Sequence, residues 1–323
     1  MIYLNEKHID DIGLDWHQMI DSIKQASASL EAGDFAQPVK PYLRYRDLTN
    51  RIIAMPAFLG GETDLAGIKW IASFPKNIDK NLRRANSVTV LNEAATGIPQ
   101  CFINTAKVSG IRTAAVTGYV LKEVLDKREG SGPLNIGMTG FGPIGQLHLE
   151  MVEELLGDRI NKVSIFDIRD VNTDKISSSI KSKVTVCQSW EEAYEGADVF
   201  MTCTVSNAPY VNKAPKKGSI QLNVSLRDYV ADYKDFVDVM LVDDWEEVCR
   251  EKTDIEMMHI EKNLQKGDTS SLADVASNAA FANLKEDDVV MFNPMGMAIF
   301  DIAIGKHYYQ KALDHKKGQF LED

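Results

Sequence analysis

Charged side chains inside apolar stretches are the first candidates for chemistry in this chain. Lys69 lies in "AGIKWI", which otherwise predicts a buried strand, and Arg112 lies in "GIRTAAV", near the start of a predicted helix of small residues. A buried lysine is costly unless it is paired or works with a lowered pKa. Lys69 on the solvent face of an edge strand is the simpler alternative. Lys40 and Arg44 lie in the proline-punctuated segment "QPVKPYLR", so a local basic pocket for a small acid is possible.

A glycine-rich stretch, "NIGMTGFGPIGQLHLEMVEELLG", is the second candidate. Its Gly140, Gly142 and Gly145 form a GxGxxG pattern between a predicted strand and a predicted helix. In a dinucleotide-binding loop, the first glycine makes the tight turn and the second lets the backbone approach the pyrophosphate. The third lets helix and strand pack closely, and the helix N-terminus attracts the phosphate charge. We therefore interpret this stretch as a dinucleotide cradle, with a purely structural glycine turn as the alternative.

The next predicted strand ends at Asp167, 22 residues after Gly145 (167 − 145). An acidic residue at this place hydrogen-bonds the ribose hydroxyls of the cofactor. It also repels a 2′-phosphate, so Asp167 favours NAD over NADP. Arg169 leaves NADP open, because a guanidinium two residues further on can pair with a phosphate.

The helix that follows the glycines is expected at 144–156, with Gly157 at its C-terminal cap. We expect His148 to pack inside this helix rather than to take part in catalysis. The apolar stripe that should face the sheet consists of Ile144, Leu147, Met151 and Leu155.

The elements that must position these residues form two patterns. After residue 133, β-branched apolar runs alternate with helical stretches, which predicts a doubly wound parallel sheet of Rossmann type. The predicted strands are 134–139, 162–167, 184–187, 198–203, 219–224, 239–243 and 289–293, with a further helix at 189–195.

The first part of the chain predicts a separate α+β domain for substrate binding, built on a mixed or antiparallel sheet. Its expected elements are a helix at 16–33, strands at 51–59 and 65–74, a hairpin at 87–103 and a long helix at 108–132. We place this domain at residues 1–117, completed by 300–323 through a C-terminal helix at 296–318. The NAD-binding Rossmann domain is then 118–299, so the fold class is α/β.

Composition limits the compartment and the partners. The 323 residues, 44% of them hydrophobic, allow about two domains with buried cores, and the net charge of −11 argues against general nucleic-acid binding. The segment "MIYLNEKHIDDIGLDW" lacks the order of a signal peptide, and no run approaches the ~18 apolar residues of a membrane span. The 4 scattered cysteines predict free thiols in a reducing cytoplasm, and the 6 histidines show no metal-ligand spacing.

Several segments together carry a resemblance to a known family. They are "QPVKPYLR", "RIIAMP", "GIKWIASFPKN", "VLNEAATGIP", "IRTAAV", the glycine fingerprint, "TCTVS", "NVSLRD" and "NPMGMAIFD". In this order the sequence resembles the ornithine cyclodeaminase/μ-crystallin family over nearly the whole chain. The resemblance implies an NAD-dependent enzyme that acts on a small amino acid, and a homodimer formed through the first domain.

Within that family, a narrower set of segments is similar to the dehydrogenases of 2,3-diaminopropionate biosynthesis, which serve siderophore and antibiotic pathways. The set is "QPVKPYLR", "NRIIAMP", "GIKWI", "VDDW" and "NPMGMAI". Those enzymes act on N-(2-amino-2-carboxyethyl)-L-glutamate. The similarity implies oxidative hydrolysis of this compound to 2,3-diaminopropionate and 2-oxoglutarate, through hydride abstraction and imine hydrolysis.

The resemblance also implies roles for individual residues. Lys69 matches the catalytic lysine, and Asp228 matches the acidic residue that works on the amine or the attacking water. Arg112 matches the arginine that holds the substrate α-carboxylate. The implied substrate-binding residues are Lys40, Arg44, Met55 and Arg112, and the implied cofactor-binding residues are Thr113, Gly140, Gly142, Pro143, Ile144, Gly145, Asp167, Cys203, Thr204, Val205, Asn223, Val224, Ser225, Met295 and Gly296.

Two departures from the family pattern leave alternatives open. Lys40 stands where the family usually has an arginine, and a lysine offers a point charge rather than a bidentate fork. Residues 262–287 also differ from the usual family stretch. The lysine weakens the prediction of a pure cyclodeaminase. Another enzyme of the family, which is an ornithine cyclodeaminase, an alanine dehydrogenase or a ketimine reductase, stays an alternative, and a non-enzymatic ligand carrier of the μ-crystallin kind is another.

Overall fold

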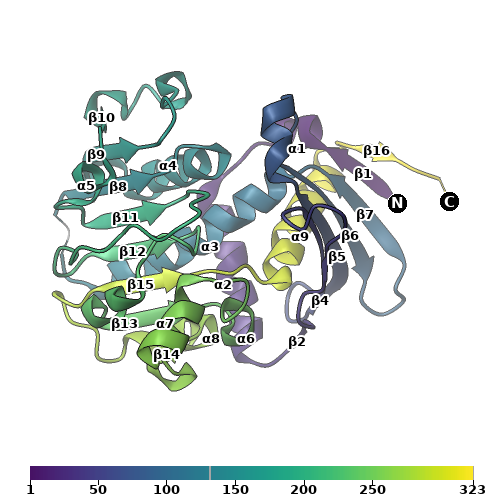
Figure 1. Cartoon of the computed structure of the whole chain (residues 1–323). Helices are drawn as coiled ribbons and strands as arrows, with labels where there is room; N and C mark the ends of the chain where they lie inside the picture. Colours follow the sequence, from purple (N-terminus) through teal and green to yellow (C-terminus); the bar gives the residue numbers. More distant parts are fainter. Residues whose placement is uncertain (131, 323) are drawn as a thin grey trace. The chain divides into compact units, whose positions relative to one another are not determined.

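The computed structural model describes residues 1–130 and 132–322 and divides into two compact units. The first unit contains Met1–Arg112 and Gly296–Asp323, and the second contains Thr113–Met295. Each unit is built on its own sheet (Figure 1). The division falls inside helix α3 (Lys107–Lys127), at Arg112 rather than at residue 117, and the chain enters the first unit again at Gly296 rather than at residue 300.

The first unit contains a mixed sheet. Its strands are β1 (Ile2–Asn5), β2 (Phe35–Ala36), β3 (Tyr42–Leu43), β4 (Arg51–Leu59), β5 (Leu65–Ser73), β6 (Ala85–Glu93), β7 (Pro99–Asn104) and β16 (Gln319–Phe320). Among the described residues they follow the order β16-β1-β7-β6-β5-β4-β2, with β3 paired to β4. β1 and β7 pair in parallel, whereas β4, β5, β6 and β7 form an antiparallel run. The predicted hairpin at 87–103 is the β6–β7 pair.

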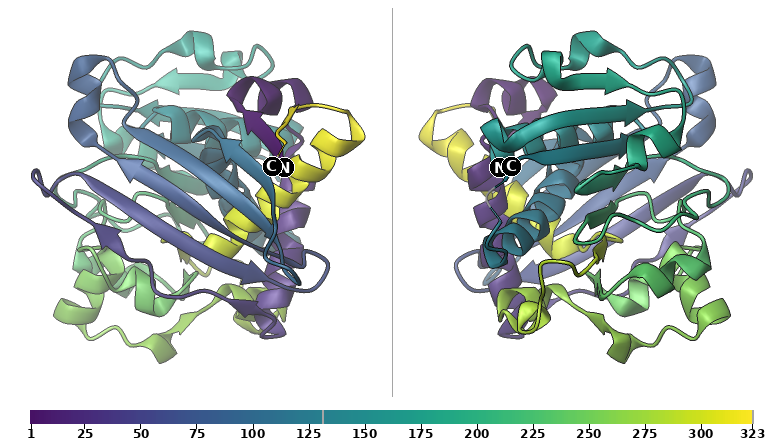
Figure 2. Two further views of the ribbon diagram at one scale, coloured as in Figure 1. Left: turned by 90° about the vertical axis from the view of Figure 1, so that its right-hand side faces the viewer. Right: turned by 90° about the vertical axis from the view of Figure 1, so that its left-hand side faces the viewer.

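Helices cover one face of this sheet. They are α1 (Glu6–Ile12), α2 (Trp16–Glu31) and α9 (Ala298–Asp314). Asp15 starts α2 by accepting the backbone N–H of Gln18 at 3.0 Å, which satisfies one of the N–H groups that a helix start leaves unpaired. α9 packs against β4, β5 and β6, and α2 packs against α9. The left view of Figure 2 looks onto the opposite face of the sheet.

The strand register places Lys69 in the interior of the first unit. Lys69 lies in β5, between Met55 of β4 and Thr89 of β6. Side chains alternate between the two faces of a sheet, and this row of residues is buried on the face that α9 covers. Trp70, the next residue, points to the other face and is 41% exposed. The alternative of a solvent-facing lysine on an edge strand is therefore wrong.

The second unit is a parallel sheet with helices. Its strands are β8 (Leu134–Thr139), β9 (Ile160–Phe166), β10 (Val184–Val186), β11 (Val199–Thr202), β12 (Ile220–Asn223), β13 (Val239–Val242), β14 (Thr269–Ser270) and β15 (Val290–Asn293). In the described residues the order is β10-β9-β8-β11-β12-β15-β13-β14 (Figure 1), and every pair is parallel. The predicted doubly wound sheet is confirmed.

The helices of the second unit complete this alternation. They are α4 (Pro143–Leu156), α5 (Trp190–Tyr194), α6 (Trp245–Val248), α7 (Asp254–Lys262) and α8 (Leu272–Ala276), together with most of α3. The segment 262–287, from which we predicted nothing, forms the edge strand β14 and α8. None of the helices formed by residues 1–130 and 132–322 has the length and hydrophobicity needed to cross a bilayer.

Helix α4 is rotated relative to the sequence prediction. Its buried residues are Gly145, His148, Leu149, Met151, Val152 and Leu156, so of the predicted stripe only Met151 is fully buried. The reason is Gly145, because a Cβ at this position would lie 2.2 Å from the carbonyl oxygen of Gly140. Because glycine has no Cβ, α4 can approach the Gly140 backbone closely with its Gly145 side facing inward. His148 is thereby buried and packs, as expected.

Candidate functional site

A buried ionic cluster lies at the centre of the first unit. The ammonium nitrogen of Lys69 is 2.7 Å from Oδ2 of Asp301, and Nε of Arg112 donates to Oδ1 of the same carboxylate at 3.0 Å. Lys69 also donates to Oγ of Ser109 at 3.2 Å. Lys69, Arg112 and Asp301 are 2%, 6% and 1% exposed. The structure thus brings together two of the predicted residues and adds a carboxylate that the prediction missed.

Burial and neighbouring charge prepare Lys69 for proton transfer. Loss of hydration is the largest effect and lowers the pKa of Lys69 from 10.5 to about 7. The positive charges of Arg112 and Lys40 lower this pKa further, whereas the charge and hydrogen bond of Asp301 raise it. A lysine with a pKa near neutrality can give up and accept a proton at physiological pH.

The segment around Lys40 holds the start of α9 in place. Lys40 is 3% exposed and donates to the carbonyl oxygen of Gly296 at 2.8 Å. The side-chain oxygen of Gln37 accepts the backbone N–H groups of Ala298 and Ile299 at 2.6 and 3.2 Å. This arrangement supplies acceptors that α9 otherwise lacks, because its N-cap residue makes no side-chain hydrogen bond. Gln37 belongs to "QPVKPYLR", but its capping role was not predicted.

Gly296, predicted to bind the cofactor, lies beside Arg112. It has φ +94°, a left-handed conformation that favours glycine, and a Cβ there would be 2.8 Å from Nη1 of Arg112. The backbone therefore passes directly over the guanidinium. Gly296 and Lys40 help to hold Arg112 in its place, while Met55 is buried opposite Lys69.

Arg44 takes a different position from the other predicted substrate residues. Its Nη1 donates to the carbonyl oxygen of Leu48 at 2.8 Å, and its guanidinium carbon lies 5.7 Å from the centre of the Tyr42 ring. Arg51 approaches the same ring, at 5.5 Å. Arg44 is therefore held by its own loop.

The glycine loop of the second unit has the geometry of a phosphate cradle. Gly140 has φ +86°, and a Cβ there would lie 2.5 Å from the carbonyl oxygen of Cys203. Gly142 caps α4 without a side-chain hydrogen bond, and a Cβ at this residue would meet no atom within 4 Å. The loop lies where the strand order reverses between β8 and β11, which is where α/β sheets bind ligands. The residues fit a dinucleotide pyrophosphate at the N-terminus of α4.

Asp167 is held against this loop. Its Oδ2 accepts the backbone N–H of Phe141 at 2.7 Å, and its Oδ1 accepts that of Arg169 at 2.9 Å. A carboxylate has about four acceptor sites, so Asp167 retains capacity for the hydroxyls of a ribose. The side chain of Arg169 is 66% exposed, with Nε 3.9 Å from Asp167.

Asp228 is fixed by hydroxyl groups and by backbone contacts. It is 0% exposed, and its carboxylate accepts the hydroxyls of Thr204 and Ser225. Its carbonyl oxygen accepts the N–H groups of Tyr210 and Val211, both at 2.7 Å. Two residues predicted to bind the cofactor, Thr204 and Ser225, thus have a defined contact with the predicted acid.

A second carboxylate, which the sequence analysis missed, supports the Asp228 loop. Oδ2 of Asp254 accepts the backbone N–H groups of Asp228 and Tyr229 at 3.0 and 3.2 Å, and Nδ2 of Asn223 at 2.9 Å. Burial raises the pKa of Asp254 to about 7. Asn223 also donates to Asn293 at 2.8 Å and accepts the N–H of Leu226 at 3.1 Å. The side chain of Asn223 is thus bound within the protein.

The other residues predicted to bind the cofactor sit at the ends of elements of the second unit. Thr113 lies on α3, while the rest begin α4 or follow the carboxyl ends of β11, β12 and β15: Pro143, Ile144, Cys203, Val205, Val224 and Met295. Burial raises the pKa of the Cys203 thiol above its usual range, so this thiol stays protonated. Val205 is 61% exposed.

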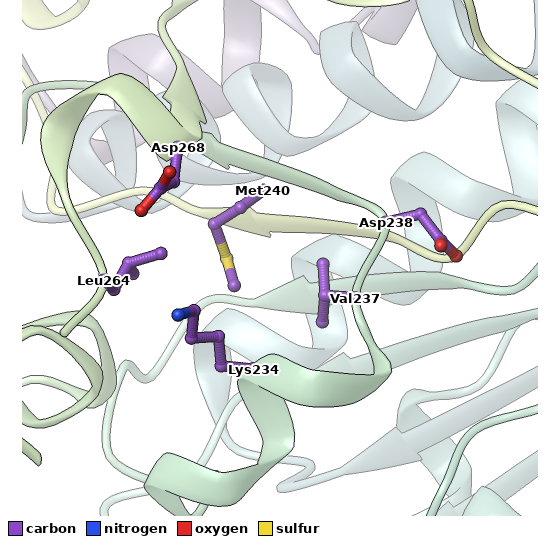
Figure 3. A pocket seen from close by; sticks show the side chains of 6 residues that line it. All are labelled: Lys234, Val237, Asp238, Met240, Leu264 and Asp268. Atoms are coloured by element: carbon purple, nitrogen blue, oxygen red, sulfur yellow. The ribbon is translucent and has the colours of Figure 1, made fainter. Parts of the chain in front are cut away.

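The second unit also has a surface pocket (Figure 3). It is lined by Lys234, Val237, Asp238, Met240, Leu264 and Asp268. Val237 and Asp238 precede β13, so the pocket lies at the amino end of that strand, whereas the glycine loop follows the carboxyl end of β8. Among the described residues, no group of three or more His, Cys, Asp or Glu side chains is arranged to hold a metal ion.

Known proteins resemble the chain over nearly its whole length. The N-((2S)-2-amino-2-carboxyethyl)-L-glutamate dehydrogenase of Staphylococcus aureus is 31% identical, covering 99% of this chain and 98% of that protein. The alanine dehydrogenase of Archaeoglobus fulgidus is 24% identical, with 99% and 98% covered.

Solved structures show the same fold. The Δ1-pyrroline-2-carboxylate reductase of Thermococcus litoralis, in complex with NADH and L-proline, superposes with a TM-score of 0.88 at 22% identity, covering 99% of this chain and 100% of that one. An archaeal alanine dehydrogenase dimer with bound NAD gives 0.82 at 22% identity, with 100% and 99% covered. A sequence profile of the ornithine cyclodeaminase/mu-crystallin family matches residues 10–316, and the chain belongs to this family.

Proposed function

We propose that this chain is an NAD-dependent oxidoreductase that cleaves N-(2-amino-2-carboxyethyl)-L-glutamate by oxidation and hydrolysis, with 2,3-diaminopropionate and 2-oxoglutarate as products. The observation that carries the proposal is the buried Lys69, with a pKa lowered to about 7, beside the guanidinium of Arg112. This pair suits a substrate that has an amine next to a carboxylate. The relative from Staphylococcus aureus, 31% identical over 99% of this chain, supports the choice of substrate.

The glycine loop and Asp167 are proposed to hold NAD. The N–H groups at the start of α4 would bind the pyrophosphate, and Asp167 would accept the ribose hydroxyls. When bound, NAD accepts a hydride from the carbon that carries the amine. The carboxylate of Asp167 favours NAD because it would repel the additional phosphate of NADP.

Arg112 and Lys40 are proposed to bind the carboxylate next to the reacting carbon. Both are buried, and a charge-assisted hydrogen bond from a guanidinium fixes the direction of a carboxylate. This orientation places the amine relative to Lys69, whose amine in its neutral form takes the proton that the substrate nitrogen must lose. Asp228 is proposed to act on the water that adds to the resulting imine.

The overall reaction balances with one water molecule. The secondary amine and NAD⁺ give an imine, NADH and a proton, and water then adds to the imine carbon. The carbon–nitrogen bond breaks to release 2-oxoglutarate and the primary amine of 2,3-diaminopropionate. We propose that this product supplies siderophore or antibiotic biosynthesis. The free cysteines Cys101, Cys187, Cys203 and Cys249 support a reducing, cytoplasmic location.

A homodimer is proposed through the face of the first unit's sheet that α9 does not cover. The side chains adjacent to the Lys69 row point to this face, among them Ile68, Trp70, Val88 and Val90. Trp70 is 41% exposed there, and large exposed apolar faces mark interfaces. A Trp70→Glu variant should elute as a monomer in size-exclusion chromatography, and an unchanged elution volume would exclude this face.

The substrate is tested by incubating the protein with NAD⁺ and N-(2-amino-2-carboxyethyl)-L-glutamate. We expect absorbance at about 340 nm from NADH and equal amounts of the two products by mass spectrometry, with activity abolished in Lys69→Ala. Alanine and ornithine serve as competing substrates, because the alanine dehydrogenase of A. fulgidus is 24% identical over 99% of this chain. If only alanine or ornithine is turned over, the proposed substrate is wrong. If no amino acid produces NADH, the protein is better explained as a ligand carrier.

A further inference from the structure

Asp301 contacts both of the basic groups that the proposed reaction needs. Its two oxygens have separate basic partners: Nζ of Lys69 forms an ion pair with Oδ2 at 2.7 Å, and Nε of Arg112 donates to Oδ1 at 3.0 Å. The sequence offered one sign of this role, a single acidic residue within the apolar run "AIFDIAI" of α9. Asp301 is 1% exposed, so its carboxylate is shielded from bulk solvent.

The location of Asp301 is set by the chain around it. It lies in the first turn of α9, whose first two N–H groups are accepted by Gln37. Gly296, two residues before the helix start, accepts a hydrogen bond of 2.8 Å from Lys40 through its carbonyl oxygen. Since a helix is stiff over one turn, fixing its start also fixes the carboxylate.

Charge gives Asp301 a second role. Lys40, Lys69 and Arg112 are each at most 6% exposed, and Arg112 and Lys40 both act on Lys69 by repulsion. Buried like charges separate unless a counter-charge lies between them. Asp301 supplies this counter-charge, because it bridges Lys69 and Arg112.

The contacts of Lys69 with Asp301 and Ser109 also restrict the direction in which its lone pair points. A neutral primary amine has two N–H groups and one lone pair in a tetrahedral arrangement. Asp301 and Ser109 are two acceptors within reach of this nitrogen, at 2.7 and 3.2 Å. When they accept the two N–H groups, the lone pair points in the remaining tetrahedral direction.

We propose that Asp301 is a positioning residue that aims the lone pair of Lys69 and the guanidinium of Arg112 toward the substrate, with Ser109 as its companion. This inference rests on the proposed role of Lys69 as the base. Asp301 acts through these two residues.

The variant Asp301→Asn tests this role. An amide has one acceptor oxygen and one NH₂ group, so it presents an acceptor at only one of the two positions that Lys69 and Arg112 contact. We expect kcat to fall on the order of 100-fold and KM to rise, since misplaced catalytic groups cost about this much. The acidic limb of the pH profile of kcat/KM should move about one pH unit lower, because Asp301 raises the pKa of Lys69.

Asp314→Asn is the matched control, since Asp314 ends the same helix and is exposed. It should leave kcat, KM and the pH profile unchanged. Ser109→Ala removes one acceptor without a change of charge, and we expect kcat to fall about 10-fold with NAD affinity preserved. Wild-type kcat, KM and pH profile in a folded Asp301→Asn protein would overturn the proposal.

A measurement without substrate separates this inference from the proposed function. The rate at which Lys69 reacts with an amine-acetylating reagent, followed by peptide mass spectrometry against pH, reports its titration directly. The midpoint should lie about one pH unit lower in Asp301→Asn than in the wild type. A lower midpoint together with an inactive wild type would refute the proposed substrate alone, whereas an unchanged midpoint would refute the role of Asp301.

Discussion

The buried ammonium of Lys69 should make the free energy of unfolding of the protein depend on pH. Its pKa is about 7 in the folded protein and 10.5 in the unfolded chain, so the unfolded chain binds the proton more tightly. The charged form therefore opposes folding below about pH 7, and this cost disappears as the pH rises toward 10.5. Replacement of Lys69 by Met removes the titrating group and keeps an unbranched side chain of similar length.

The size of the effect follows from these two values. At about 1.4 kcal/mol per pH unit, the difference between about 7 and 10.5 corresponds to about 5 kcal/mol in total. Between about pH 7.5 and about pH 9.5, the free energy of unfolding of the wild type should rise by about 2–3 kcal/mol relative to that of Lys69→Met. The variant also loses the ion pair with Asp301, but the effect of this pair on the protonation of Lys69 is already contained in the pKa of about 7.

The assay is urea unfolding followed by circular dichroism, without NAD or substrate because ligands would add their own stabilisation. Two compact units can give two transitions, and the one that unfolds the unit containing Lys69 is analysed. Lys76→Met is the control, because Lys76 is exposed and its pKa is raised by Asp47. Stability from a raised lysine pKa is lost only above the unfolded value, outside the range measured.

Equal pH dependence in the wild type and Lys69→Met would refute the reasoning. It would mean that Lys69 keeps an ordinary pKa in the folded protein, and a base with that pKa would be almost fully protonated at neutral pH.

Three further predictions concern the second unit. Gly145→Ala should raise the dissociation constant of NAD at least about 10-fold in titration calorimetry, because the added Cβ would lie 2.2 Å from the Gly140 carbonyl; unchanged affinity would exclude the cradle. Asp167→Ala should weaken NAD binding about 10- to 100-fold and NADP binding less, and a constant ratio of the two affinities would contradict the role of Asp167. Asp254→Asn should lower the free energy of unfolding by about 1–3 kcal/mol and reduce turnover, because the N–H groups of Asp228 and Tyr229 lose a charged acceptor; full activity would show that Asp228 needs no such support.

The strands of the sheets were predictable because buried strands consist mainly of apolar residues. β4 and β8 begin and end at the predicted residues, 51–59 and 134–139, since each is a continuous apolar run. Lys69 was identifiable for the same reason, as one charge in such a run. β14 has 2 residues and its assignment depends on pairing with β13, which no local pattern reports.

The partners of the candidate residues were less predictable than the residues themselves. Asp301 lies 232 positions after Lys69 (301 − 69), and only the folded chain shows that the two meet. Asn223 was assigned to the cofactor from a motif, but its amide is bound to Asp254 and Asn293. Motifs identify which side chains matter, whereas the direction of an amide depends on acceptors from distant strands.

The first unit is discontinuous, and this has a consequence for the order in which the protein forms during synthesis. Thr113–Met295 is an uninterrupted stretch that is translated in full before Gly296–Asp323. Domains generally fold as units while the chain emerges, so the second unit can form first. The sheet of the first unit lacks the helix that packs against β4, β5 and β6 until α9 is made. A nascent chain therefore carries Lys69 and Arg112 without the carboxylate of Asp301 until α9 has been translated.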